Sequence, residues 1–134
     1  MGQVILCVDD NVEFLRQVCE LLEGDGYTTL QAHDGVEALA ILDKRHDEIG
    51  LLIIDLALPE LSGFEVMGAI TRRPAPFPIL AVSAVFRGPY LDMTRYMGAD
   101  EAIRKPESGD PLPREEWLGT VRRLLADGSK AGHP

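Results

Sequence analysis

The chain has 134 residues, a length that suits one folded domain able to bury about two thirds of its unfolded surface without disulfides. Its 13 basic and 22 acidic residues give a net charge of −9, which disfavours direct binding to nucleic acid or to an anionic membrane. The first apolar run is too short for a signal sequence or a membrane span, so we expect no membrane insertion and a cytoplasmic protein.

Five short apolar runs alternate with segments of helical period. The runs are Val4 to Val8, Tyr27 to Ala32, Leu51 to Leu56, Ile79 to Val82 and Ala102 to Ile103. This alternation is a repeated βα unit and predicts an α/β fold with a parallel sheet. The first and third runs are almost continuously apolar, which is typical of central strands covered on both faces.

Two of the helical segments carry a clear apolar stripe. One stripe recurs at i, i+3, i+4, i+7 and the other at i, i+4, i+7, so each helix should pack one face on the sheet. The members are Leu15, Val18, Cys19 and Leu22, and then Trp117, Val121 and Leu124. Because Cys7 and Cys19 both fall at apolar positions, we expect buried, unpaired thiols and a reducing compartment.

Helix boundaries agree with this periodicity. Glycines should end the first helix, and turn-forming residues should begin the second and third. These are Gly24 and Gly26, then Asp34 with Gly35, and Pro59 with Ser62 and Gly63.

Three acidic residues lie at the ends of strand runs. Asp9 and Asp10 come after the first run, and Asp55 comes at the end of the third. Ligands bind beyond the carboxyl ends of parallel strands, so these acids should converge on one point. Clustered carboxylates repel one another unless one is protonated or a hard divalent ion such as Mg²⁺ lies among them. Helix capping accounts for part of the first pair but not for Asp55.

Two further strand ends supply polar groups. Ser83 follows the fourth run, and Lys105 with Pro106 follows the fifth. A hydroxyl can donate to a phosphoryl oxygen, an ammonium can offset its charge, and a carboxylate can act as nucleophile. The set therefore indicates phosphoryl transfer to an aspartate, a reaction that depends mainly on positioning and charge neutralisation.

The segments "ILCVDDN", "LLIIDLALPELSGFEVM", "LAVSA" and "GADEAIRKP" resemble the response regulator receiver domain. The resemblance covers about residues 3 to 126, which we take as the receiver domain, with a disordered tail at 127–134. It implies a flavodoxin-like doubly wound sheet of five parallel strands in the order 2-1-3-4-5, with five helices.

The resemblance also implies roles for individual residues. Asp55 is expected to be the phosphoacceptor. Asp10, Asp55 and the backbone carbonyl of Ala57 are expected to bind Mg²⁺, with Asp9 assisting through water. Ser83 and Lys105 are expected to bind the phosphoryl group, and the Lys105–Pro106 peptide is expected to be cis.

The chain departs from the family pattern at Ala102, where receivers usually carry Tyr or Phe. The usual aromatic switch is therefore not available; Phe86 or Tyr90 could replace it, although both are more simply read as packing or surface residues. Neither Ala57 nor Val85 can orient an attacking water, so we expect a rather persistent phosphoryl group.

The leading interpretation is a stand-alone, phosphorylation-controlled switch of a two-component system or phosphorelay, not an enzyme acting on external substrates. It would take phosphate from a histidine kinase or a histidine phosphotransfer protein and regulate a downstream protein target. The expected output surface includes Tyr90, Arg95, Ala102 and Trp117, although core packing is the favoured role of Trp117.

Two alternatives remain open. One is a degenerate receiver that binds its partner regardless of phosphate, which Ala102 alone supports. The other is an aspartate-dependent phosphohydrolase, which Ala57 disfavours because such enzymes typically carry a second acid at that position.

Overall fold

The computed structural model describes residues 4–58, 63–71, 77–84, 98–107 and 109–127. Five strands in these segments form one parallel sheet in the order β2-β1-β3-β4-β5, which confirms the predicted topology. The strands are β1 (Val4–Val8), β2 (Thr28–Ala32), β3 (Ile49–Asp55), β4 (Ile79–Ser83) and β5 (Glu101–Arg104).

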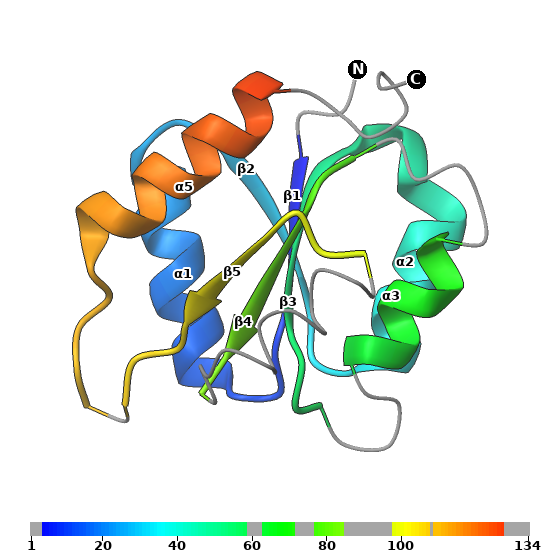
Figure 1. Ribbon diagram of the computed structural model, residues 1–134, viewed down its shortest axis with the longest axis horizontal. Coiled ribbons are helices and arrows are strands. Elements are labelled where there is room, and N and C mark those ends of the chain that lie inside the picture. Colours follow the sequence, from blue (N-terminus) through cyan, green and yellow to red (C-terminus); the bar gives the residue numbers. More distant parts are fainter. Residues whose placement is uncertain (1–3, 59–62, 72–76, 85–97, 108, 128–134) are drawn as a thin grey trace.

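Helices cover both faces of the sheet. In Figure 1, α1 and α5 lie on one side of the strands and α2 and α3 lie on the other. The bounds are α1 (Val12–Gly24), α2 (Gly35–Arg45), α3 (Gly63–Thr71) and α5 (Arg114–Asp127), with a short 3-10 helix η1 (His46–Glu48) before β3. The fourth of the five predicted helices falls within 85–97, outside the described residues.

The core consists of two apolar clusters separated by the sheet. Leu6 and Val8 of β1 belong to the cluster under α2 and α3, whereas Ile5 and Cys7 belong to the cluster under α1 and α5. Successive side chains of a strand point to opposite faces, so a central strand with both faces covered must be apolar throughout. Burying one such Leu or Ile contributes about 1.5–3 kcal/mol.

Capping residues set where two helices begin. The side chain of Asn11 accepts a hydrogen bond from the Phe14 N–H at the start of α1, and Asp34 accepts one from the Glu37 N–H at the start of α2. Each cap satisfies a backbone donor that has no partner within its helix. Asp10 is therefore not the capping residue of α1 and is left exposed beside it.

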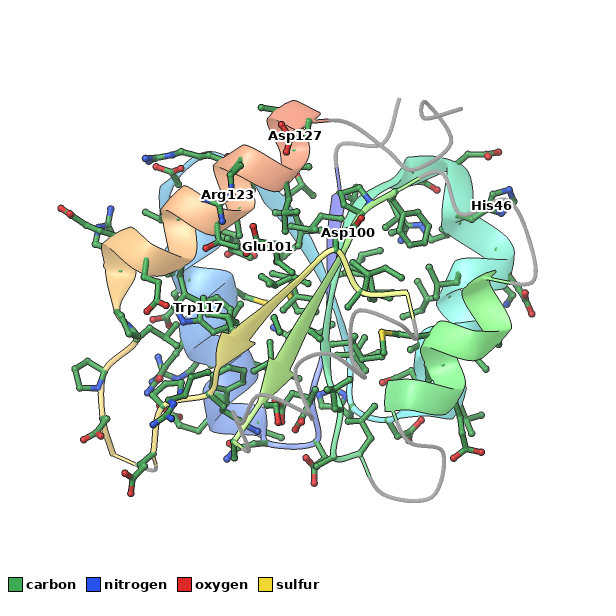
Figure 2. All side chains as sticks on the ribbon, in the orientation of Figure 1. His46, Asp100, Glu101, Trp117, Arg123 and Asp127 are labelled. Carbon is green, nitrogen blue, oxygen red and sulfur yellow. The ribbon has the colours of Figure 1, made fainter. Side chains whose placement is uncertain are left out.

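Predictions about individual core residues are confirmed. Both Cys7 and Cys19 are buried and unpaired. Trp117 is fully buried in the cluster under α1 and α5, and Figure 2 shows it between α5 and the sheet. It is therefore a core residue and not part of an exposed output surface. In the segments that the structure describes, no helix has the length and apolar character needed to cross a bilayer.

Candidate functional site

Strand register brings the acidic residues together. Val8 of β1 pairs with Ile54 of β3, so the residues that follow them, Asp9 and Asp55, lie side by side at the same sheet edge. Ser83 of β4 pairs with Arg104 of β5, which places Lys105 directly beyond that pair. Parallel pairing thus gathers residues from four strand ends at one place, the lower edge of the sheet in Figure 1.

The three acids form a cluster able to hold a cation. Asp9 and Asp55 are 1% and 4% exposed, whereas Asp10 is exposed, and one oxygen from each lies within 4.8 Å of the others. Two ligands of one Mg²⁺ are at most about 4.2 Å apart, twice the metal–oxygen distance, so a small closure suffices. Hard carboxylate oxygens are the donors that this ion prefers.

Lys105 bridges the two buried acids. Its Nζ donates to Asp9 Oδ1 at 3.0 Å and to Asp55 Oδ2 at 3.1 Å, and it lies 2.8 Å from Asp9 Oδ2. The lysine side chain is 17% exposed, so the ion pairs are largely shielded from water. One ammonium thus offsets part of the charge of two buried carboxylates.

Burial and ion pairing change the pKa values of Asp9 and Lys105. Loss of solvation raises the pKa of Asp9 to about 6, even though the hydrogen bonds from Lys105 and from the Asn11 N–H favour the ionised form. Burial by itself would lower the pKa of Lys105, but its contacts with Asp9 and Asp55 outweigh that effect and raise it. The cluster is short of positive charge in the absence of a metal ion.

Backbone donors fix the orientation of both buried acids. The Asn11 N–H donates to Asp9 Oδ1 at 2.8 Å, and the Ala57 N–H donates to Asp55 Oδ1 at 2.9 Å. Asp9 Oδ2 is buried and accepts no hydrogen bond among the described residues, although Lys105 lies close to it. A buried carboxylate oxygen with unused acceptor capacity fits a site that binds a cation directly or through water.

Ser83 and Lys105 are held next to each other by the backbone. The Lys105 N–H donates to the Ser83 carbonyl at 2.9 Å, and Ser83 is 5% exposed. The expected cis peptide between Lys105 and Pro106 is wrong, because every peptide bond in the described residues is trans. Continuation of the β4–β5 pairing to Lys105 is enough to bring its ammonium to the acids.

Phe14 is a site residue that sequence reasoning missed. Its ring lies under the Lys105 ammonium, with 4.8 Å between Nζ and the ring centroid. The ring also lines a cavity of about 170 Å³ between the first turn of α1 and the segment after β5. The available signal was the i, i+4 spacing of Phe14 with Val18, which extends the apolar stripe of α1 toward the site.

Of the residues expected to take part in switching or output, Ala102 is described by the structure and four others are not. Ala102, at the position usually aromatic, is partly buried and packs against the cluster under α2 and α3. Phe86, Tyr90, Arg95 and Val85 lie outside the described residues.

Residues 5–114 match the family model described as the response regulator receiver domain. The chain is 38% identical over 123 residues to the transcriptional regulatory protein CpxR of Escherichia coli K12, covering 90% of this chain and 48% of that protein. The chain thus spans about half the length of CpxR and of other curated relatives of that size.

A second relative matches along its whole length. The polar-differentiation response regulator DivK of Brucella ovis is 30% identical over 129 residues, covering 95% of this chain and 99% of that protein. Among solved structures, the chemotaxis response regulator CheY4 of Vibrio cholerae superposes with a TM-score of 0.80 at 26% identity, covering 92% of this chain and 99% of that one.

Proposed function

The chain belongs to the response regulator receiver family, and from that premise we propose that it is a signalling switch phosphorylated on Asp55. Receiver domains are signalling switches rather than conventional enzymes. The proposed domain comprises residues 3–126, and its proposed phosphodonor is a histidine kinase or a histidine phosphotransfer protein.

The observation that carries the proposal is the double ion pair of Lys105 with Asp9 and Asp55. It joins a potential nucleophile, a second acid and a cation at one sheet edge. Phosphoryl transfer needs little covalent chemistry from a protein, because alignment and neutralisation of the developing charge provide most of the catalysis. A carboxylate already hydrogen-bonded to an ammonium has both features.

In the proposed reaction, an Asp55 carboxylate oxygen bonds to phosphorus while the bond between phosphorus and the donor imidazole nitrogen breaks. The imidazole leaves with the electron pair of that bond, and Asp55 becomes an acyl phosphate. The Ala57 N–H holds Asp55 Oδ1, which leaves Oδ2, next to Lys105, as the oxygen proposed to attack.

Once the phosphoryl group is on Asp55, Lys105 and Ser83 would bind its oxygens. The lysine turns from the carboxylates to the new phosphoryl oxygens, and the serine hydroxyl donates a hydrogen bond to one of them. Asp10, Asp55 and the Ala57 carbonyl would hold Mg²⁺, with Asp9 acting through water, and the ion would supply neutralisation of phosphoryl charge.

The phosphorylated protein would then bind a downstream protein target through an altered surface. Attack of water on the acyl phosphate would end the signal. A phosphate-independent binding module is the second candidate, and Ala102 is the residue that favours it.

Intact-protein mass spectrometry after incubation with an acyl phosphate tests the proposal. One phosphoryl adduct is expected in wild type with Mg²⁺, and none is expected with a chelator or in the Asp55→Asn variant. Asp43→Asn, an exposed acid on α2, is the matched control and should give the wild-type adduct.

Absence of an adduct with both the acyl phosphate and a phosphorylated histidine kinase would favour the phosphate-independent module. An adduct that persists in Asp55→Asn would contradict the assigned acceptor.

A further inference from the structure

The ring of Phe14 contacts the ammonium group of Lys105. Phe14 lies in the first turn of α1, is 8% exposed, and its ring centroid is 4.8 Å from Lys105 Nζ. A cation within about 6 Å of an aromatic face is attracted by the ring's charge distribution, and more strongly when water is excluded. The ring thus favours one position of the ammonium.

The same ring also contacts α5. The centroids of Phe14 and Trp117 are 5.9 Å apart and the planes are inclined by 67°, an edge-to-face arrangement. Such pairs prefer a defined geometry and resist independent movement of either ring. Phe14 therefore stands between the cation of the site and the buried tryptophan of α5.

Within the described part of the chain, no polar contact holds the Trp117 side chain in place. The side chain is fully buried, and its Nε1–H has no hydrogen-bond acceptor among the described residues. A buried indole usually finds a partner, so the position of this ring depends on packing, including the edge contact with Phe14. In Figure 2, Trp117 lies between α5 and the sheet.

We propose that Phe14 is a positioning residue for Lys105, and that its contact with Trp117 carries a change in the lysine's position from the acidic site to α5. The inference rests on the proposed function, because phosphorylation of Asp55 is what draws Lys105 away from Asp9. When the ammonium moves, the attraction that holds the Phe14 ring changes, and Trp117 repacks against it. Ala102 offers no aromatic ring on β5, whereas this route runs through α1 and α5.

Tryptophan fluorescence tests the inference because the chain has one tryptophan. Emission is recorded for the full chain with Mg²⁺ before and after acyl phosphate is added, and mass spectrometry of the same sample measures the adduct. Wild type should show an emission change proportional to the adduct. In Phe14→Leu the adduct should form, roughly three- to tenfold more slowly because the cation–π contact is lost, and the emission change should disappear.

Two further variants separate positioning from simple packing. Phe14→Tyr keeps the ring, and its hydroxyl can extend into the neighbouring cavity, so it should restore both the rate and the emission change. Leu22→Val removes one methylene group from the same core cluster without touching Lys105, and it should keep the phosphorylation-dependent change.

The outcomes distinguish the two proposals. No adduct in wild type contradicts the proposed function itself. An adduct without any emission change in wild type, or an equal change in wild type and Phe14→Leu, overturns the role of Phe14 and leaves phosphorylation of Asp55 standing. If Phe14→Leu does not fold, failure of Phe14→Tyr to retain the wild-type response overturns it equally.

Discussion

The ammonium nitrogen of Lys105 lies 2.8 Å from Oδ2 of Asp9, although the two residues are 96 positions apart in the chain. The contact joins the end of β5 to the end of β1 across the intervening strands β3 and β4. It makes the stability of the fold and the charge of the site depend on the same pair.

Removing this ammonium should destabilise the protein when no metal is present. Lys105→Met keeps most of the aliphatic stem but leaves two buried carboxylates without their cation, at a cost of about 3 kcal/mol. Urea unfolding at neutral pH with a chelator measures the loss. Mg²⁺ should stabilise this variant more than wild type, because the ion replaces the missing positive charge.

Lys44→Met is the matched control, since Lys44 is exposed in the last turn of α2. Equal losses for Lys44→Met and Lys105→Met would contradict the importance of the buried pair.

The contribution of Asp9 to stability without metal should fall as pH rises from about 4 to about 6. The pKa of Asp9 is raised from 3.8 to about 6 by burial, so the folded state holds this proton more tightly than the unfolded state does. The stabilising contribution of the Asp9 proton is then fully present below about pH 4 and is lost as pH rises past the folded-state pKa of about 6. The raised pKa of Lys105 leaves that residue protonated throughout this range.

Urea unfolding of wild type and Asp9→Asn across this range measures the effect. As pH rises from about 4 to about 6, the unfolding free energy of wild type should fall by on the order of 2 kcal/mol relative to that of Asp9→Asn. A difference that does not vary with pH would rule out titration of Asp9 as its source.

Adding an amide next to the proposed acceptor, Asp55, should shorten the lifetime of the phosphoryl group. Ala57 is exposed, and its methyl group cannot orient water beside Asp55. Ala57→Asn should raise the hydrolysis rate by on the order of tenfold, less than a true general base provides. Loss of the adduct with time, followed by mass spectrometry, gives the rate. Ala40→Asn on the exposed side of α2 should leave it unchanged.

The cap of α2 should contribute measurably to stability. Asp34 Oδ1 accepts a 2.7 Å hydrogen bond from the Glu37 N–H. Asp34→Ala should cost about 1 kcal/mol and lower Tm by about 3–5 °C for a domain of this size. Asp47→Ala changes the charge equally at a residue whose side chain is 90% exposed, and thermal unfolding should show little effect there.

The sheet and the acidic cluster were predictable from local patterns. Apolar runs marked the strands, and the rule that ligand-binding groups follow parallel strands brought Asp9, Asp55 and Lys105 together. The confirmed strand order came from resemblance to a known family and not from the runs themselves, because periodicity does not specify which strands are neighbours.

Features that depend on tertiary contacts were harder to predict from the sequence. The isomer before Pro106 was mispredicted, because the trans preference of such a bond is only about 0.5–1 kcal/mol and surrounding contacts decide it. The start of β3 was placed two residues late, because Ile49 joins the strand through an irregular pairing with Val4. The contacts of Phe14 with Lys105 and Trp117 depend on side-chain directions that spacing alone does not define.

Locating the phosphoryl group tests directly whether Asp55 is the phosphoacceptor. After incubation with acyl phosphate and Mg²⁺, borohydride reduction of the acyl phosphate followed by tryptic peptide mapping identifies the modified residue. Trypsin cleaves after Arg16, Arg45 and Arg72, so Asp55 lies on a different peptide from Asp9 and Asp10. We predict modification at Asp55, in the peptide of residues 46–72. Modification in the peptide of residues 1–16, or an unmodified Asp55 in phosphorylated protein, would rule out Asp55 as the acceptor.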